Sequence, residues 1–284
     1  MAATEEVVGR LPRRGERVAI IGCGTSYNMA CCYARLRESS GQGETDAFPA
    51  SEVLSRRIYE RLVFISRTGT TTEVLEALGA VPVGVPTTAI TANGSTPIAR
   101  AADCSVDLDF ADGRSVVDTC FATSVLMLAI AHLGGNPAPM VNQAETVLRQ
   151  PLPKNWHQVR QFVFLARGWT VGLAQEAALK LREAAQVWAE AYPAMEYRHG
   201  PISVADEATL VWCLGAPPQD MEKDVKGVGA SFISSELHPL AELVRVQRLA
   251  VELAKARGLD PDRPRHLARS VILGSPGGFA KGAR

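Results

Sequence analysis

Two short segments of the sequence carry residues whose types and spacing could do chemistry. The first, residues 66–73, reads Ser-Arg-Thr-Gly-Thr-Thr-Thr-Glu and is dense in hydroxyl groups. The second, residues 174–201, contains several carboxylates and ends in Glu-Tyr-Arg-His-Gly-Pro. Hydroxyls at a helix start can hold a phosphate, whereas a carboxylate and an imidazole can move protons. The two segments together predict chemistry on a phosphorylated sugar.

The hydroxyl-rich segment lies where an apolar strand is expected to give way to a helix. A helix N-terminus carries unpaired N–H groups and the positive end of the helix dipole, so it binds an anion without a basic side chain. Gly69 allows close backbone approach to a ligand, and Arg67 adds a permanent charge. The alternative is an ordinary helix N-cap, in which Thr70 and Glu73 form a capping box.

A second turn supports the phosphate interpretation. Residues 22–26 read Gly-Cys-Gly-Thr-Ser and follow an earlier apolar strand. In an open parallel sheet both turns emerge at the carboxyl edge, where ligands bind, so they can converge on one ligand. The turn is not a dinucleotide fingerprint, because position 27 is Tyr27 rather than glycine, and no P-loop lysine motif occurs. We therefore expect neither a nicotinamide cofactor nor nucleotide hydrolysis.

The second segment begins on a helix predicted over residues 172–189. Glu176, Lys180 and Glu183 fall at positions i, i+4 and i+7 of this helix and therefore share one face. Apolar side chains from Leu173 to Trp188 line another face. A stripe of this kind is, by itself, most often a solvated helix face.

The residues that follow the stripe favour a catalytic role. Glu190, Glu196 and His199 lie close together in the sequence, and His-Gly-Pro places the imidazole in a constrained turn. A 1,2-proton shift in a sugar needs one group to open the ring and one to carry the proton between carbons. The remaining histidines have no comparable carboxylate cluster and are expected to be structural or surface residues: His132, His157, His238 and His266.

The elements that must position these residues alternate along the chain. Short apolar runs, each followed by residues at helical spacing, predict strands that are buried on both faces. The expected strands span residues 17–22, 61–66, 87–91 and 105–108, and the expected helices span residues 29–36, 71–78 and 116–133. This alternation predicts a doubly wound, three-layer α/β structure with a parallel sheet.

A restart of the pattern predicts two domains. Gly and Pro cluster at residues 134–139 and 150–153, around a single helical stretch, which is typical of a domain boundary. Beyond it a strand, a turn and a helix recur, so we expect two flavodoxin-like copies of one α/β unit. The later elements are strands at residues 161–166 and 209–213 and a helix at 240–256. The predicted domains are residues 1–136 and 137–273, followed by a flexible glycine-rich tail over residues 274–284.

Composition narrows the class of protein. The 284 residues include 30 basic and 30 acidic side chains, so no net charge would attract nucleic acid or an anionic membrane. The longest apolar run, residues 125–131, is shorter than the roughly 20 residues needed to cross a bilayer, and the first residues carry no apolar signal segment. We expect a cytoplasmic protein. The six cysteines lack metal-ligand spacing, so they predict reduced thiols and no metal site.

The two turns and the Glu/His segment resemble the sugar isomerase (SIS) domain family. The resemblance spans about residues 15–273 and is to the tandem-SIS isomerase half of glucosamine-6-phosphate synthase and its stand-alone amino-sugar-phosphate relatives. It implies that the substrate phosphate is held by Thr25, Ser26, Ser66, Arg67, Thr68 and Thr71. It further implies substrate contacts from Gly24, Val116 and Arg269, and a catalytic group of Glu176, Lys180, Glu183 and His199.

In this family the position matching Glu183 is the isomerising base, and the one matching His199 assists ring opening. Family members dimerise, and the histidine segment reaches into the site of the neighbouring subunit. The resemblance therefore implies a homodimer here, with an inactive monomer.

Two departures from the family pattern affect the expected reaction. The chain passes from Met1 almost directly into the first strand, without the synthase's glutaminase domain, so we expect no ammonia transfer from glutamine. The synthase also has a C-terminal lysine that forms an imine with the ketose. Arg269 stands at that position, and a guanidinium stays protonated and forms no imine. Lys281 is a poor substitute because its surroundings are expected to be flexible.

These observations predict an aldose–ketose isomerase acting on a hexosamine 6-phosphate, best glucosamine 6-phosphate, with or without loss of its nitrogen. The reaction needs no cofactor, because a positioned carboxylate and histidine carry the protons. One alternative is a lyase that uses the same base to eliminate the C3 hydroxyl of N-acetylglucosamine 6-phosphate. Another is a phosphosugar-binding regulator without catalysis, although such regulators usually join one SIS domain to a DNA-binding module. The sequence does not distinguish hexose epimers.

Overall fold

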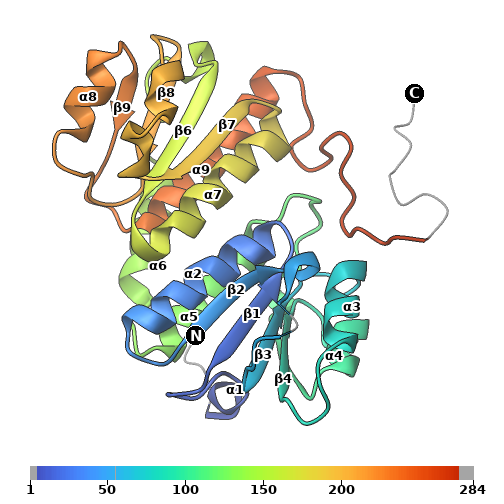
Figure 1. Cartoon of the computed structure of the whole chain (residues 1–284). Helices are drawn as coiled ribbons and strands as arrows, with labels where there is room; N and C mark the ends of the chain where they lie inside the picture. The colour runs from blue at the N-terminus through green and yellow to red at the C-terminus, as the bar shows by residue number, and fades with distance from the viewer. Residues whose placement is uncertain (1–4, 55, 275–284) are drawn as a thin grey trace. The chain divides into compact units, whose positions relative to one another are not determined.

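The computed structural model describes residues 5–54 and 56–274, which fall into two compact units (Figure 1). One unit contains the chain up to Pro137 together with the segment that begins at His266, and the other contains residues 138–265. Each unit holds one all-parallel sheet with helices. The α/β class expected from the sequence is therefore confirmed. The predicted tail, apart from Gly274, lies outside the described residues.

The sheet of the first unit has five strands in the order β2-β1-β3-β4-β5. Their bounds are β1 Val18–Gly22, β2 Thr45–Pro49, β3 Arg61–Ile65, β4 Thr87–Thr91 and β5 Cys104–Asp107. Every residue of β1, β3 and β4 is buried, as continuous apolar strands covered on both faces require. The strand order is that of the flavodoxin-like doubly wound fold.

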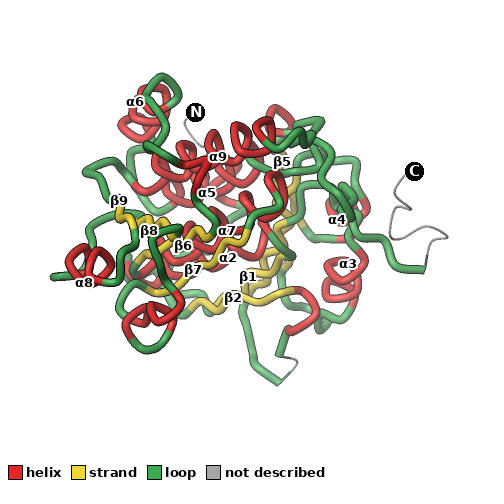
Figure 2. Tube along the Cα trace, turned by 90° about the horizontal axis from the view of Figure 1, so that it is seen from above, coloured by secondary structure: helices red, strands yellow, loops and turns green. Residues whose placement is uncertain are grey.

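Helices cover both faces of this sheet, as the view in Figure 2 shows. Helices α3 (Thr72–Gly79) and α4 (Pro97–Ala101) bury Val74 and Ile98 against Ile21 and Phe64 of the strands. Helices α2 (Thr25–Ser39) and α5 (Cys120–His132) pack side by side on the opposite face. A short helix, α1 (Glu5–Gly9), precedes β1. The first unit is therefore a three-layer structure.

Strands β1 and β3 are direct neighbours, with Val18 opposite Arg61 and Ile21 opposite Phe64. From β1 the chain crosses to β2 on one side and then returns to β3 on the other. The order of the strands therefore reverses between β1 and β3. In open α/β sheets this switch point, at the carboxyl ends of the strands, is where ligands bind.

The sheet of the second unit has four strands in the order β7-β6-β8-β9, which repeats the order of the first four strands of unit one. The bounds are β6 Gln161–Ala166, β7 Trp188–Pro193, β8 Thr209–Cys213 and β9 Ser231–Ile233. The helices are α6 Ala138–Val147, α7 Val171–Lys180, α8 Met221–Gly227 and α9 Pro239–Ala256. Single 3-10 turns lie at Ala50–Glu52, Asp109–Ala111, Trp156–Gln158, Gly168–Thr170, Glu196–Arg198 and Pro201–Val204.

Two predicted helix boundaries are wrong. The helix predicted over residues 172–189 ends as α7 at Lys180, continues as a π-helical turn over Leu181–Ala185, and gives way to strand β7. Gln186 ends the helical geometry because its φ of 52° is left-handed. Trp188 therefore belongs to an edge strand rather than to a helix face. Likewise α5 begins at Cys120, so the residues just before it form a loop.

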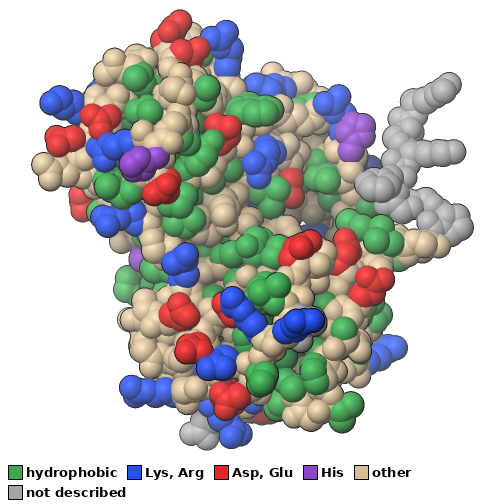
Figure 3. Space-filling view, in the orientation of Figure 1, with side chains coloured by type: hydrophobic (Ala, Val, Ile, Leu, Met, Phe, Trp, Pro, Cys, Tyr) green, Lys and Arg blue, Asp and Glu red, His purple; other side chains and the backbone are tan. Residues whose placement is uncertain are grey.

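Charges are mixed on the face of the molecule drawn in Figure 3, where basic and acidic side chains lie interspersed. This mixture agrees with the equal counts of 30 basic and 30 acidic residues. None of the helices in the described part of the chain combines the length and apolar character that a membrane span requires.

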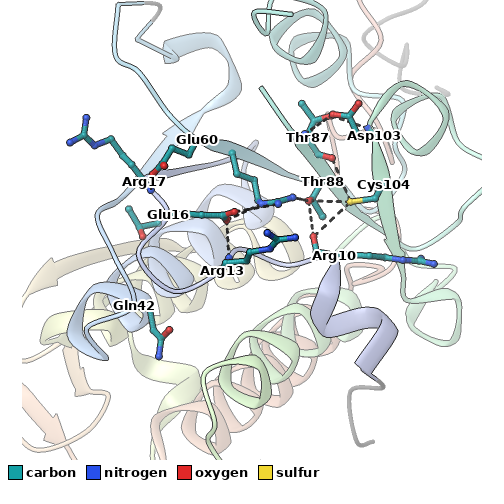
Figure 4. A network of polar contacts seen from close by, with 12 residues as sticks. Arg10, Arg13, Glu16, Arg17, Gln42, Glu60, Thr87, Thr88, Asp103 and Cys104 are labelled. Carbon is teal, nitrogen blue, oxygen red and sulfur yellow. Dashed lines mark hydrogen bonds and ion pairs between the residues drawn. The ribbon is translucent and has the colours of Figure 1, made fainter. Parts of the chain in front are cut away.

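A polar network ties the chain before β1 to the amino ends of the strands (Figure 4). Glu16 accepts hydrogen bonds from Arg61 Nε at 3.0 Å and from the Arg13 N–H at 2.8 Å. Thr88 Oγ1 donates to the Arg10 carbonyl at 2.8 Å. Burial alone would raise the pKa of Glu16, but the hydrogen bonds and charges of Arg61 and Arg13 outweigh burial and lower it.

We predict that Glu16→Gln lowers the free energy of unfolding at pH 7 by about 1–3 kcal/mol, because Arg61 loses a charged partner. A lowered pKa means that the carboxylate stabilises the fold above its unfolded-state pKa, and that this stabilisation is lost as the pH falls through the folded-state pKa. Urea unfolding at pH 7 and pH 3 should therefore show a difference between variant and parent that shrinks at pH 3. Glu52→Gln, at an exposed position, is the control. An equal difference at both pH values would contradict the assignment.

Candidate active site

The hydroxyl-rich loop connects β3 to α3, at the carboxyl end of the sheet of the first unit. Ser66 is buried, and its Oγ accepts a hydrogen bond from the Gly69 N–H at 3.1 Å. Gly69 has a φ of +62°, and a Cβ at this position would lie 2.3 Å from Thr96 Oγ1. Glycine is therefore required here both for backbone conformation and for space.

The capping-box alternative for this loop is wrong. Helix α3 begins at Thr72, its N-cap is Thr71, and no side chain makes a capping hydrogen bond. The hydroxyls instead converge on one residue that is distant in sequence: Ser270 Oγ lies 3.2 Å from Thr68 Oγ1, 2.9 Å from Thr70 Oγ1 and 3.4 Å from Thr71 Oγ1. The threonine hydroxyls of this loop therefore lie together as a group and do not cap helix α3.

Ser270 belongs to a segment that lies along the loop. The Val271 carbonyl accepts from the Thr72 N–H at 3.1 Å, and the Leu273 N–H donates to Thr72 Oγ1 at 2.9 Å. The predicted second domain, residues 137–273, includes this segment, whereas in the structure the segment belongs to the first unit from His266 on. Ser270 was not among the predicted site residues. The one feature of the local sequence that could have indicated a role for Ser270 is its position directly after Arg269.

Arg67 lies beside the loop but points its guanidinium at backbone carbonyls. Its Nη1 donates to the Ser115 carbonyl at 3.1 Å, and its Nη2 donates to the Val116 carbonyl at 3.0 Å. The side chain is buried. Arg67 therefore links the hydroxyl-rich loop to residues 115 and 116. Val116, one of the predicted substrate contacts, is thereby held close to this loop.

Arg269 contacts the chain just before Ser115, at residues 112 and 113. It forms an ion pair with Asp112 and donates from Nη1 to the Gly113 carbonyl at 2.5 Å. A guanidinium in such contacts stays protonated and cannot act as a nucleophile. The structure thus gives Arg269 a holding role in the first unit. Lys281 lies outside the described residues.

The second predicted turn, residues 22–26, follows β1 and leads into α2. Gly24 is the N-cap of α2, with a φ of 54° and no side-chain capping bond. A Cβ on Gly22 would lie 2.6 Å from the backbone carbon of Ser26, so this turn also requires glycine. Because β1 and β3 are neighbours, both turns lie at the same end of the sheet, next to the switch point.

The acidic and basic stripe of α7 is buried rather than solvated. Lys180 Nζ lies 3.3 Å from Glu176 Oε1 and 2.5 Å from Glu183 Oε2. The side chains of Lys180 and Glu176 are 1% and 0% exposed, whereas that of Glu183 is 19% exposed. The solvated-face alternative is therefore wrong. A buried ammonium is tolerated here because two carboxylates lie close to it.

Glu183 owes its position to the π-helical turn over Leu181–Ala185. Such turns are rare and occur often at functional sites. Arg182 Nη1 donates to the Ala189 carbonyl at 2.9 Å, which ties the turn to strand β7. Among Glu176, Lys180 and Glu183, Glu183 is the side chain that solvent can reach, and its carboxylate contacts the ammonium of Lys180. This is the arrangement of an ionised base that can reach a substrate.

His199 lies in the same unit but apart from this cluster. It follows the 3-10 turn Glu196–Arg198, its N–H donates to the Glu196 carbonyl at 2.9 Å, and its side chain is exposed. Within the described residues no hydrogen bond joins its imidazole to Glu183 or to any other side chain. Glu190 is engaged elsewhere, because its Oε2 accepts from Gln161 Nε2 at 2.9 Å.

Two of the other histidines have structural partners. Tyr33 Oη lies 2.8 Å from His132 Nδ1, and burial together with the nearby Arg37 charge lowers the pKa of His132. His238 is the N-cap of α9, where its Nδ1 accepts from the Leu240 N–H at 3.2 Å. Across residues 5–54 and 56–274, no group of three or more His, Cys, Asp or Glu side chains is arranged to hold a metal ion.

Comparison with known proteins agrees with this architecture. Residues 13–133 match the sequence profile of the SIS domain family. The matched residues include the five-stranded sheet of the first unit and helices α2 to α5. Both hydroxyl-rich turns lie inside the matched range, whereas the Glu183 and His199 segments lie beyond it.

Several proteins similar to this chain carry names that refer to sugar phosphates. The glutamine–fructose-6-phosphate aminotransferase (isomerizing) of Thermus thermophilus is 31% identical over 327 aligned positions, which cover 92% of this chain and 53% of the relative. The chain thus spans about half the length of the curated relatives it matches. The glucosamine-6-phosphate deaminase of Thermotoga maritima is 26% identical, with a TM-score of 0.80 over 95% of this chain and 94% of that one.

Two more distant structures share the fold. The C-terminal domain of the glucosamine–fructose-6-phosphate aminotransferase of Francisella tularensis has a TM-score of 0.75 at 19% identity, covering 93% of this chain and 90% of that one. The tagatose-6-phosphate ketose/aldose isomerase of Escherichia coli has a TM-score of 0.70 at 17% identity, covering 90% and 86%. The chain therefore shares its overall fold with these two proteins.

We predict that Lys180→Met lowers the free energy of unfolding by about 3–5 kcal/mol, because it leaves buried carboxylates without their cation. Adding Glu176→Gln should restore part of this loss, since one of the two uncompensated charges is then removed. Urea unfolding measures both effects. Lys255→Met, which removes an exposed ion pair with Glu252, is the matched control and should change stability by about 0–1 kcal/mol. An equally small change for Lys180→Met would show that the buried cluster is not ionised.

Proposed function

We propose that this chain is an aldose–ketose isomerase acting on a hexosamine 6-phosphate, with glucosamine 6-phosphate as the best-fitting substrate. The observation that carries the proposal is the buried Glu176–Lys180–Glu183 cluster, in which Glu183 alone is accessible and is held beside an ammonium. The named activities of the relatives support the substrate class, above all the deaminase from Thermotoga maritima, which this chain covers almost completely.

In this proposal the hydroxyl-rich turns hold the substrate phosphate. Thr68 and Thr71 of one turn, with Ser66 at its base, and Thr25 and Ser26 of the other would donate hydroxyl hydrogens to the phosphate oxygens. The N-termini of α2 and α3 add backbone N–H groups and positive dipole ends. Ser270, whose hydroxyl already lies among the threonine hydroxyls, would contribute to the same group.

Glu183 would then carry the proton between C2 and C1. With the sugar ring open, the carboxylate takes the C2 proton while a proton from water adds to the C1 carbonyl oxygen, and an enolamine forms. The carboxylate then returns its proton to C1, and the nitrogen releases one proton to water, which gives a ketimine at C2. Water hydrolyses the ketimine to fructose 6-phosphate and ammonia. Lys180 holds the carboxylate of Glu183 in place through their contact at 2.5 Å.

This route does not require an imine between the enzyme and the sugar. The nitrogen of the substrate itself supplies the C2 imine, so a lysine at position 269 is not needed. Arg269 can then serve as a holding group, as its contacts with Asp112 and Gly113 suggest. His199 would open the ring by moving a proton between the anomeric hydroxyl and the ring oxygen.

A lyase remains a second candidate, because Arg269 in place of lysine is compatible with it as well. Removal of the C2 proton of N-acetylglucosamine 6-phosphate by Glu183 could expel the C3 hydroxyl as water, leaving a C2=C3 double bond. The acetylated nitrogen would be kept. The two candidates therefore differ in substrate and product while sharing the base.

The protein is proposed to work as a homodimer in which His199 acts in the site of the neighbouring subunit. Two large apolar side chains close to His199 in the sequence are exposed, Met195 at 46% and Val204 at 63%. Exposed apolar residues gathered in one region are typical of protein interfaces. The exposed imidazole of His199 would gain a function only when such a partner is present.

We predict that Glu183→Gln lowers turnover of glucosamine 6-phosphate by about 10²–10⁴-fold, because the amide cannot accept the C2 proton. Ammonia and ketose release would be measured, in parallel with the ultraviolet absorption of an elimination product from N-acetylglucosamine 6-phosphate. Ammonia from the first substrate supports the isomerase, and a chromophore from the second supports the lyase. Glu207→Gln, at an exposed position, should leave the rate unchanged. Phosphosugar binding without turnover of either substrate would favour the regulator.

A mixing experiment tests the shared site. Glu183→Gln and His199→Ala should each be inactive as homodimers, and subunit exchange between them should restore activity. In the mixed dimer one site combines an intact Glu183 with an intact His199 from the other subunit. Recovery of about a quarter of the parental rate is expected from random exchange, because half of the dimers are mixed and each has one intact site. No recovery despite demonstrated exchange would place both residues in the same subunit's site.

A further inference from the structure

A polar pocket lies at the outer edge of the sheet of the second unit, where strand β9 has no further neighbour (Figure 1). The cavity measures about 540 Å³, a volume within the range of small-ligand sites. Its lining comes from the loop before β6, from β8, β9 and α8, and from α9. All of these elements belong to the second unit, and none of them carries a residue assigned to the proposed isomerisation.

Two cations face this pocket, Lys154 and Arg245. Lys154 is exposed and takes part in no ion pair within the part of the chain that the structure describes. Arg245 is 17% exposed, and its guanidinium carbon lies 5.2 Å from the centre of the Trp212 ring. A guanidinium held over an aromatic ring keeps a fixed position, so little rotamer freedom is lost when it binds an anion.

The charge of Arg245 is only loosely compensated. Among the residues that the structure describes, Arg245 forms one ion pair, with Glu242 at 3.7 Å. Glu242 is fully buried and already accepts shorter hydrogen bonds from Trp212 Nε1 at 2.7 Å and from Ser235 Oγ at 2.5 Å. The Nε of Arg245 is buried and finds no hydrogen-bond partner among the described residues. The long contact with Glu242 therefore leaves part of the positive charge of Arg245 uncompensated where this side chain lines the cavity.

The remaining polar lining suits an anion as well. Ser231 begins β9 and Ser234 follows its last residue, and both add hydroxyl donors to the lining. Glu222 is the one carboxylate in the lining, and it forms an ion pair with Lys226 at 2.6 Å, outside the pocket. The pocket therefore has an excess of positive charge and of hydrogen-bond donors.

We propose that this pocket binds a small anion carrying a phosphate or carboxylate group, at a site distinct from the hydroxyl-rich loops of the first unit. Arg245 and Lys154 pair with the anion, and Ser231 and Ser234 donate hydrogen bonds to it. Phe232 and Pro153 provide apolar contact for the body of the ligand. Such a site gives the chain a second point at which a metabolite can act.

Calorimetric titration of the full chain with inorganic pyrophosphate and, separately, with citrate tests the proposal and distinguishes phosphate from carboxylate ligands. We expect a binding event that Lys154→Ala weakens about tenfold, the effect of losing one hydrogen bond to a charged group. Ser234→Ala should weaken it less. Glu222→Gln should strengthen it severalfold, because a repelling charge is removed. Lys223→Ala, on the same helix but outside the lining, is the matched control and should change nothing.

Thr68→Ala distinguishes the pocket from the hydroxyl-rich loop. This variant should leave binding of the probe to the pocket unchanged and should alter only binding to the loop. If no anion binds in the pocket, the proposed isomerisation is unaffected. If the isomerisation is not observed, the proposed anion site is likewise unaffected. The proposal is overturned if neither probe binds at millimolar concentration, if Lys154→Ala and Glu222→Gln leave both isotherms unchanged, or if Glu222→Gln weakens binding. Circular dichroism of each variant verifies that the fold is retained.

Discussion

Parallel strand pairing is the constraint on which the rest of this structure depends. Because every strand in both sheets runs in the same direction as its neighbours, each connection must return over a face of the sheet, and here most connections do so as helices. The carboxyl ends of β1 and β3 therefore lie together, and the turns that follow them become neighbours without any contact of their own. The grouping of hydroxyls in the first unit is thus a result of topology first and of side-chain chemistry second.

The buried charges of the second unit follow a different logic. A lysine 1% exposed can remain charged only if carboxylates surround it, and Glu176 and Glu183 do so at 3.3 and 2.5 Å. The π-helical turn then makes the two carboxylates unequal, since Glu176 stays inside and Glu183 reaches the surface. A regular helix would have kept the spacing that the sequence suggests. The irregular turn gives the two glutamates different surroundings.

Local sequence patterns predicted the parts of the fold whose burial is uniform. The strands β1, β3, β4, β6 and β8 have continuous apolar runs because both of their faces are covered, and each was expected within a residue or two. The start of strand β7 falls in the helix predicted over residues 172–189. A half-exposed edge strand directly after an α-helix gives no clear change in the spacing of apolar residues. Ser270 could not be found in this way, since its contacts join residues about 200 positions apart. Arg67 was expected to face an anion, and its hydrogen bonds to two carbonyls depend on a loop that no pattern predicts.

The contact between Ser270 and Thr68 spans 202 positions of the chain, and this separation has a consequence for synthesis. At a translation rate of about 5–20 residues per second, Thr68 would be added to the chain roughly 10–40 seconds before Ser270. During this interval the sheet of the first unit can form, because its strands and helices all precede Pro137. Its threonine hydroxyls meanwhile must be satisfied by water. The first unit of the nascent chain is therefore the first to have its core and the last to have its loop complete.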